Sequence, residues 1–217
     1  MALTAVETIY PPMKINLEEG FFMPRKVREL LDGGIYHIFN RGNDRRKLFQ
    51  DPEDFRYFLN QLNHAKEELK AVLYHYCLMT NHFHLLLQVV EGGSLPRLMH
   101  RAQLAYARYF KKKYKFMGHV FQERFRSPRI PEESYYLQCG RYIERNPVKA
   151  GLVKDATEYI WSSAAYYAHG RPDPLVTPNL YYNGMGVSST ERQDNYQKFL
   201  SIDEPYSAIV DQALTRV

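Results

Sequence analysis

The stretch that decides the fold reads LKAVLYHYCLMTNHFHLLLQVV and spans residues 69–90. It is rich in apolar, β-branched and aromatic residues, and Met79-Thr80-Asn81 interrupts it, so it predicts two strands joined by a tight turn. Because strand side chains alternate between faces, His82 and His84 share one face while Phe83 lies on the other. The two imidazoles stand about 7 Å apart along the strand, and this separation suits two ligands of one metal ion.

The segments around this hairpin predict an α+β fold. We expect a strand at 35–40, a helix from Asp51, a helix from Ser94, a fourth strand or strand-like hairpin at 118–127, and a helix from Pro131 through Arg145. The resulting order, β-α-β-β-α-β-α, begins like a ferredoxin-like split βαβ arrangement, an antiparallel sheet with helices on one face. Asn146-Pro147 should stop or kink the last helix, because proline disfavours helical geometry in the residue before it.

Composition places the chain among ordinary globular proteins. It has 217 residues, of which 45% are hydrophobic and 24% charged, and no apolar run reaches the length of a membrane span. The first seven residues lack the basic start and apolar core of a secretory signal. Cys77 and Cys139, the two cysteines, suit buried thiols in a reducing compartment. We therefore expect a cytoplasmic protein with no membrane partner.

The chain divides into three parts by composition. Residues 1–32 contain several prolines and form an N-terminal arm, with a turn of helix expected at 25–31. Residues 33–170 hold the regular elements, and residues 171–217 form a C-terminal extension that starts with a proline-rich linker. Within the extension we expect one helix over 191–200 and another near the end.

Basic residues favour nucleic acid as a partner. The net charge is +5, and 18 tyrosines and 12 phenylalanines are interleaved with the charges. Such pairing suits single-stranded nucleic acid, which offers phosphates and unstacked bases. Taken singly, each cluster is more typical of a solvated surface, with the aromatic residues in the core. The candidate DNA-binding residues are Arg41, Arg45, Arg46 and Lys47 after the first strand, and Arg124 and Arg126 in the fourth; a lysine run, 111–115, ends the second helix.

The last helix carries a second group of candidate residues. Tyr142 and Asn146 are four residues apart and share one helical face. If that face lies over the sheet opposite His82 and His84, two imidazoles and an amide oxygen surround one point, with a phenol beside them. This donor set suits Mg²⁺ or Mn²⁺ bound together with phosphate oxygens, and the phenol could then attack phosphorus. Alternatively, Tyr142 is a packing residue and Asn146 a helix C-cap.

Taken together and in order, these motifs resemble a known family. His82-Phe83-His84 within residues 79–87, followed by YIERNPVKAGL at 142–152, is similar to the single-tyrosine HUH transposases, and specifically to the REP-associated tyrosine transposases of bacteria. Residues 36–43, 118–122 and 161–163 also match, so the resemblance covers about 33–170. Thr80 departs from the proline expected in the turn before the histidines.

The resemblance implies a fold, an activity and a set of site residues for this chain. It implies a ferredoxin-like catalytic domain over 33–170 whose tyrosine helix lies over the active site, acting on single-stranded or hairpin DNA, including REP-like repeats. Tyr142 would be the nucleophile that forms a 5′-phosphotyrosine. The metal would be held by His82 and His84, with Asn146 as a third, amide ligand. The family accommodates both monomers and homodimers.

Two other functions remain compatible with the sequence. One is a domesticated protein that recognises DNA hairpins without cleaving them. The other is an RNA-binding module, which would need exposed aromatics on the sheet and no metal. For the enzyme, we expect the face that carries His82 and His84 to be open to solvent.

Overall fold

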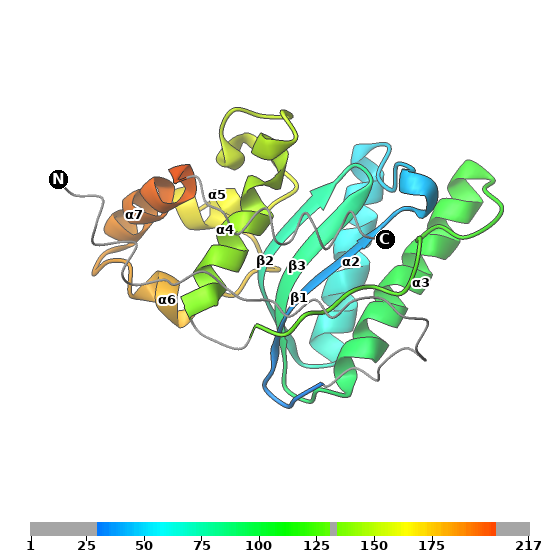
Figure 1. Ribbon diagram of the computed structural model, residues 1–217, viewed down its shortest axis with the longest axis horizontal. Coiled ribbons are helices and arrows are strands. Elements are labelled where there is room, and N and C mark those ends of the chain that lie inside the picture. Colours follow the sequence, from blue (N-terminus) through cyan, green and yellow to red (C-terminus); the bar gives the residue numbers. More distant parts are fainter. Residues whose placement is uncertain (1–29, 131–133, 203–217) are drawn as a thin grey trace, which may run out of the picture.

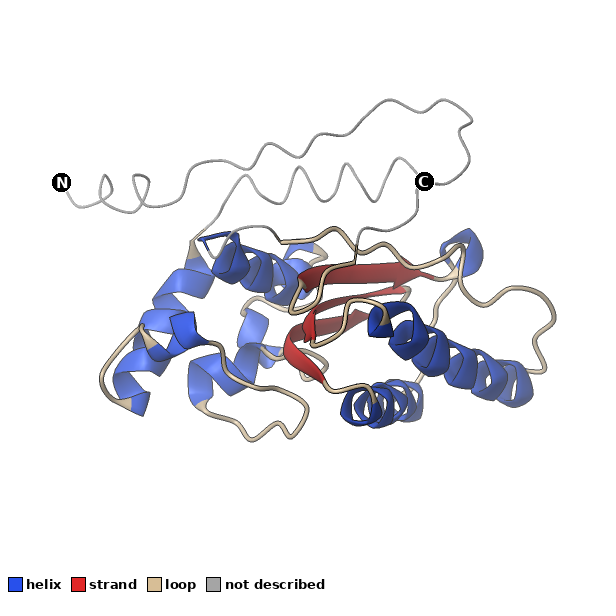
Figure 2. Ribbon diagram, turned by 90° about the horizontal axis from the view of Figure 1, so that it is seen from below, coloured by secondary structure: helices blue, strands red, loops and turns tan. Residues whose placement is uncertain are grey.

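The protein is built around a small antiparallel sheet with helices on both faces (Figures 1 and 2). The computed structural model describes residues 30–130 and 134–202. The strands are β1 (Ile35–Arg41), β2 (Ala71–Met79) and β3 (His82–Val89), and the longer helices are α2 (Pro52–Glu68), α3 (Ser94–Tyr114), α4 (Ser134–Lys149) and α7 (Ser189–Ser201). Shorter elements are η1 (Asn43–Arg45), η2 (Ala156–Glu158), α5 (Ala164–His169) and α6 (Leu180–Asn183).

The three strands pair in the order β1-β3-β2, and both pairings are antiparallel. The predicted hairpin is confirmed, since Thr80 and Asn81 alone separate β2 from β3. A bulge between Leu73 and His75 shifts the register of β2. Because a one-residue shift exchanges the faces, His75 and Cys77 lie on the same side of the sheet as His84.

The segment predicted as a fourth strand or strand-like hairpin is not a continuous strand, although it runs along the free edge of β1. Isolated antiparallel bridges join Phe39 to Arg126 and Gly42 to Phe121. Between these bridges the segment has two more residues than β1, so the ladder cannot be regular. Backbone hydrogen bonds still follow the edge, including one of 3.0 Å from the His37 amide to the Pro128 carbonyl.

One face of the sheet is covered by α2 and α3, which pack against each other. Phe83, Leu85 and Leu87 of β3 are fully or almost fully buried there, among side chains of both helices. The start of α2 agrees with the sequence, because Asp51 caps the helix through the amides of Glu53 and Asp54. This half of the molecule is the predicted ferredoxin-like layer.

The other face is covered by α4, which contacts β2 and β3. Cys77, Leu86 and Ile143 are fully buried between them. The sequence predicts that Asn146-Pro147 stops or kinks this helix, and of these the stop is wrong, since α4 continues to Lys149 with Pro147 inside it. Proline cannot donate to the carbonyl of Ile143, and the Asn146 side chain compensates by donating to that carbonyl over 3.3 Å.

The segment after α4 packs along the outer edge of β2 and onto α4. Trp161 accepts a 2.9 Å hydrogen bond from the Leu78 amide, and Ser163 donates one of 3.0 Å to the Tyr76 carbonyl. The predicted helix at 191–200 is confirmed as α7, which lies against α4 and α5. In Figure 1, α4 to α7 gather on the side of the sheet away from α3.

Several expectations fall outside the described residues: the arm up to residue 29, the start of the helix at 131–133, and the helix near the end of the chain. Within the described part, none of the helices is long and apolar enough to cross a membrane. The division of the chain at 32/33 and 170/171 stays a prediction about folding units.

Candidate active site

The two histidines of β3 lie at the start of the strand, beside the turn. Arg41 and Met79 are the sheet neighbours of His82, and Phe39 and Cys77 those of His84. His84 has an exposed fraction of 0%, whereas His82 is partly exposed. The expectation of an open face is therefore wrong for His84, because α4 and the neighbouring strands cover its ring.

A third imidazole, that of His37 on β1, meets His84. Its Nε2 atom lies 3.0 Å from Nδ1 of His84, and the two rings stack with centroids 5.2 Å apart. Burial lowers the pKa of His37 to about 3. Burial, followed by the nearby charges of His82, His37 and Lys149, also lowers the pKa of His84 well below its usual value. Both imidazoles are therefore neutral near pH 7, the form in which histidine binds metals.

Tyr142 of α4 lies directly over this group. Its ring meets the His84 ring edge-on, with centroids 5.7 Å apart at 90°, and lies 5.9 Å from the His37 ring. Only 4% of Tyr142 is exposed. The ammonium group of Lys149 is 4.8 Å from the centre of the tyrosine ring, so a fixed positive charge accompanies the phenol.

Asn146 lies one helical turn after Tyr142 and is mostly buried. Its side-chain nitrogen donates a 2.8 Å hydrogen bond to the Tyr142 carbonyl as well as the bond to Ile143. Because the nitrogen is engaged, the amide oxygen is the atom that could bind a cation.

The residues present fit a divalent ion. Nε2 of His84 is buried and has no hydrogen-bond partner among the described residues. An unpaired imidazole nitrogen in the interior is costly unless a ligand takes it up. Among residues 30–130 and 134–202, no cluster of three or more His, Cys, Asp or Glu side chains is placed to hold a metal. A site here would thus combine imidazoles with oxygens of other kinds.

Three candidate DNA-binding arginines meet at the edge of β1. Arg41 donates a hydrogen bond to the side chain of Gln122. Arg41, Arg124 and Arg126 also line one shallow hollow, and the last two are exposed. The structure therefore brings together two clusters that are about eighty residues apart in the sequence.

The remaining candidates follow in and after η1. Arg45 and Lys47 are exposed. The guanidinium of Arg46 lies 4.0 Å from the centre of the Phe116 ring, at the end of the lysine run. The loop that follows β1 therefore lies next to the end of the lysine run.

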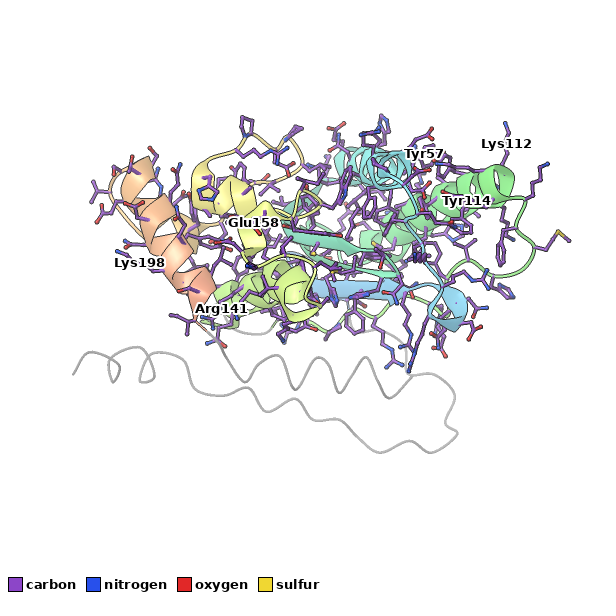
Figure 3. The ribbon with its side chains drawn as sticks, turned by 90° about the horizontal axis from the view of Figure 1, so that it is seen from above. Tyr57, Lys112, Tyr114, Arg141, Glu158 and Lys198 are labelled. Carbon is purple, nitrogen blue, oxygen red and sulfur yellow. The ribbon has the colours of Figure 1, made fainter. Side chains whose placement is uncertain are left out.

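The lysine run is divided between structural and solvated residues. Lys113 lies within 2.7 Å of Asp51, 3.0 Å of Glu53 and 2.9 Å of Asp54, and so joins the end of α3 to the start of α2. Lys111 and Lys112 are exposed, and Figure 3 shows Lys112 and Tyr114 at the α3 end of the molecule, far from Arg141 and Lys198.

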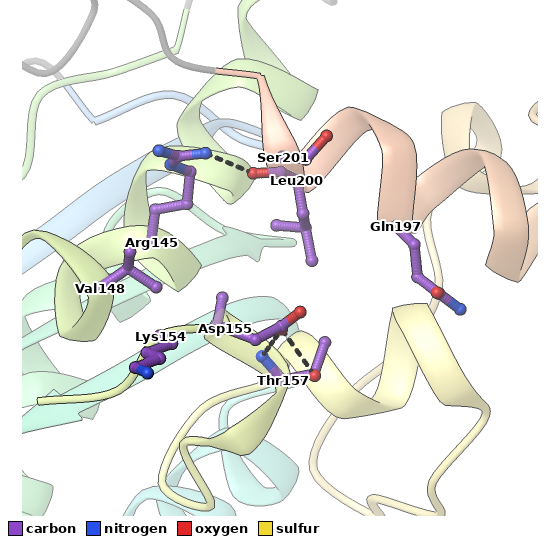
Figure 4. A pocket seen from close by; sticks show the side chains of 9 residues that line it. Arg145, Val148, Lys154, Asp155, Thr157, Gln197, Leu200 and Ser201 are labelled. Carbon is purple, nitrogen blue, oxygen red and sulfur yellow. Dashed lines mark hydrogen bonds between the residues drawn. The ribbon is translucent and has the colours of Figure 1, made fainter.

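A cavity of about 260 Å³ lies on another side of α4, between η2 and α7 (Figure 4). Arg145 reaches across it and donates a 2.6 Å hydrogen bond to the Leu200 carbonyl. None of the predicted site residues lines this cavity, so it is separate from the histidine and tyrosine group.

Comparison with known families decides the class of the protein. The model of the IS200-like transposases matches residues 32–146, more than half of the chain, and this range includes the histidines, Tyr142 and Asn146. The chain belongs to the IS200-like transposase family. It is a transposase, as the sequence predicted.

Two solved structures are similar to this transposase, and the first of them supports its fold. One is a REP-associated tyrosine transposase bound to a REP hairpin: 18% identity, 73% of this chain and 93% of that one covered, and a TM-score of 0.59. Another, a transposase candidate from Deinococcus radiodurans R1, shares 19% identity over 56% of this chain and 97% of that one, with a TM-score of 0.40. No curated protein matches the sequence.

Sequence reasoning missed two residues of the transposase site. The sequence places His37 in a strand motif but gives it no role in the site, because its contact with His84 depends on the register between β1 and β3. Lys149 approaches Tyr142 because α4 continues past Pro147, where the sequence predicts a stop or a kink. Its spacing of seven residues from Tyr142, two helical turns, was the available signal.

Proposed function

We propose that this transposase cleaves and rejoins single DNA strands through a covalent link to Tyr142. The observation that carries the proposal is the edge-on contact between the Tyr142 ring and the buried His84 ring, with His82 beside it. A tyrosine against paired imidazoles is the arrangement needed to bring a phenol oxygen to a metal-bound phosphodiester.

His82, His84 and the amide oxygen of Asn146 would hold a Mg²⁺ or Mn²⁺ ion. When bound, the ion would polarise the phosphodiester and neutralise the charge that develops on it. The protein's own part is to hold the His84 imidazole in a buried position and to keep the Asn146 nitrogen engaged, so that the amide oxygen is available.

The covalent step is a transesterification. The Tyr142 oxygen forms a bond to phosphorus and loses its proton, while the bond from phosphorus to the 3′ oxygen breaks and that oxygen gains a proton. A 5′-phosphotyrosine and a free 3′-hydroxyl result. Since the number of phosphodiester bonds is conserved, the reverse reaction can join a different 3′ end. Lys149 would offset charge close to the phenol.

Hairpin or single-stranded DNA is the proposed partner. The REP-associated relative is bound to a REP hairpin, and this chain presents exposed Arg45, Lys47, Arg124 and Arg126 at or near the β1 edge. Such residues can contact phosphates and unstacked bases.

Two alternatives have less support. A sheet-face RNA-binding module would need exposed aromatics, whereas α4 covers the face of the sheet that α2 and α3 leave free. A hairpin-binding protein that no longer cleaves would have no need for a tyrosine packed against His84.

The test is the trapping of a covalent complex. Protein, labelled hairpin DNA and Mn²⁺ are incubated and separated under denaturing conditions. We expect a protein-linked DNA fragment with the wild type and none with Tyr142→Phe, while hairpin affinity stays close to normal because only one oxygen is lost.

Tyr136→Phe is the matched control, since Tyr136 belongs to the same helix but packs against Tyr74 and His75. It should form the adduct. An adduct formed by Tyr142→Phe would place the nucleophile elsewhere, with Tyr135 or Tyr136 the next candidates.

A further inference from the structure

His37 stands at the centre of the buried group and has no role in the step described above. Its ring lies 5.2 Å from those of His84 and Phe39 and 5.9 Å from that of Tyr142, measured between centroids. Its exposed fraction is 1%. A polar side chain buried this completely requires a hydrogen-bonding reason.

The hydrogen bond between His37 and His84 can exist in two forms. In the first, Nδ1 of His84 carries the hydrogen and donates it to Nε2 of His37, which leaves a lone pair on Nε2 of His84. In the second, His37 donates, and Nε2 of His84 must then carry a hydrogen.

The surroundings of Nε2 of His84 favour the first form. This atom is buried and meets no hydrogen-bond partner among the described residues. A buried N–H without an acceptor is unfavourable, and it could not coordinate a cation. A lone pair at the same place is what a divalent ion takes up.

We propose that His37 is a positioning residue that holds the His84 ring with its hydrogen on Nδ1 and its Nε2 lone pair available for the metal. The proposal rests on the proposed function in taking His84 as a metal ligand. His37 plays the part that a carboxylate or carbonyl usually plays behind a metal-binding histidine. Its own Nε2 is occupied by this bond, so His37 is not itself counted as a ligand.

The packing explains how His37 fixes the orientation as well as the tautomer. Phe39 lies 5.2 Å from His37 and 5.8 Å from His84, and the two imidazole planes differ by 29°. Neither ring can turn without displacing the other, so the direction of the His84 lone pair is set before any metal arrives.

The experiment compares three variants with the wild type. His37→Phe keeps an aromatic ring but removes the acceptor. His37→Gln restores an acceptor, because the glutamine amide oxygen can occupy a position close to that of Nε2. His100→Phe makes the same exchange at an exposed position of α3. Mn²⁺ affinity is measured by calorimetry, and the protonated nitrogen of His84 is identified by NMR of the metal-free protein labelled with ¹⁵N in histidine.

We expect hydrogen on Nδ1 of His84 in the wild type and a loss of that preference in His37→Phe. Mn²⁺ affinity should fall by about 10- to 100-fold in His37→Phe, recover substantially in His37→Gln, and stay unchanged in His100→Phe. Wild-type protein with its hydrogen on Nε2 of His84 would overturn the proposal, and this measurement needs no variant to fold. Unchanged Mn²⁺ affinity in His37→Phe would overturn it as well.

A fourth variant, His84→Ala, separates the two hypotheses. If His84→Ala loses Mn²⁺ binding while His37→Phe keeps it, only the positioning role is wrong. If His84→Ala binds Mn²⁺ like the wild type, the metal assignment fails, and the role of His37 fails with it.

Discussion

His82 and His84 are two residues apart on one strand, yet their environments differ. His84 is fully buried, whereas His82 is partly exposed, with its Nδ1 atom 2.7 Å from the side-chain oxygen of Asn81. Alternation along a strand predicts that the two side chains share a face. It does not predict how deeply each side chain is buried, because burial depends on which element packs over that face. Here α4 lies over the strand and covers its second histidine.

This difference predicts unequal effects of alanine substitution. Both His82→Ala and His84→Ala should lose Mn²⁺ binding and cleavage. His84→Ala should also lose about 1–3 kcal/mol of unfolding free energy, because it leaves a cavity and an unpaired His37 nitrogen. His82→Ala should change stability by less. Calorimetry with Mn²⁺ and urea unfolding measure the two effects; unchanged Mn²⁺ affinity in both would contradict the assignment of ligands.

At the scale of elements, α4 is held from behind by a buried polar network. Glu144 is fully buried and accepts hydrogen bonds from Ser163 at 2.6 Å and Tyr196 at 2.7 Å, while Nδ1 of His75 lies 2.9 Å from it. One carboxyl group thus joins β2, the segment before α5, and α7. Since Tyr142 is on the same helix, the C-terminal part of the chain helps to fix the nucleophile.

Removing one donor tests this network. Tyr196→Phe should lower the unfolding free energy by about 1–3 kcal/mol, because a buried carboxyl oxygen loses its partner. Tyr57→Phe makes the same chemical change at a half-buried residue of α2 whose hydroxyl forms no hydrogen bond within the described chain, and it should stay within about 0.5 kcal/mol of the wild type. Equal unfolding midpoints in urea for both variants would show that the contact contributes nothing.

A second element-scale feature is the contact between the start of α2 and the end of α3. Burial raises the pKa of Asp54, but hydrogen bonds from the Gln50 amide, Tyr114, Lys113 and Tyr109 lower it more, and the net pKa is depressed. Since the pKa is lower in the folded than in the unfolded state, this carboxylate stabilises the protein above the unfolded pKa of about 3.9. The contribution is lost as pH falls through the folded pKa.

Asp54→Asn should therefore flatten the pH dependence of stability. Unfolding free energy is measured in urea from about pH 7 down to about pH 3. The wild type should lose stability over the acid part of this range, while the variant starts lower and changes less. Parallel curves for the two proteins would rule out Asp54 as a source of the dependence.

For the whole molecule, the sequence predicted which helices and strands form and in what order better than it predicted where each element is interrupted or extended. The hairpin at 71–89, the first three helices and the placement of Tyr142 over the sheet followed from periodicity, caps and family-like motifs. The irregular pairing of residues 118–130 with β1 could not be predicted in this way. A segment with more residues between its bridges than its partner still shows the alternation of side chains that is typical of a strand. The contact between His37 and His84 was not predicted, because it depends on the register between β1 and β3. The continuation of α4 past Pro147 was not predicted either, because it depends on the Asn146 side chain, which replaces a backbone donor.

The distribution of charge leads to a prediction about DNA binding. Arg45 and Lys47 follow β1, whose edge carries Arg124 and Arg126, whereas Lys111 and Lys112 lie in the last turn of α3. Replacing Arg45 and Lys47 by glutamine should weaken hairpin binding and reduce its salt dependence, by a slope of about 0.7–0.9 for each phosphate that the protein no longer neutralises. Titrations at several salt concentrations provide the measurement.

The matched control is the double variant Lys111→Gln/Lys112→Gln, which removes the same charge from an exposed site. It should lose less affinity and less slope. If it instead loses more than the arginine-side variant, the DNA path follows the end of α3 and not the edge of β1.

The covering of the sheet edges has a consequence for colloidal behaviour. Residues 120–130 accompany the outer side of β1, and residues 161–163 with Val176 accompany that of β2. Unpaired edge strands are templates for strand addition and aggregation. Within the described chain the sheet thus offers neither edge to a second copy while both segments stay in place. The covering of β2 is the weaker of the two, because within the described chain two isolated bridges hold it, against three at β1. Its loosening on heating would expose the strand that carries His75. We expect the first insoluble species formed by this transposase to assemble through that edge.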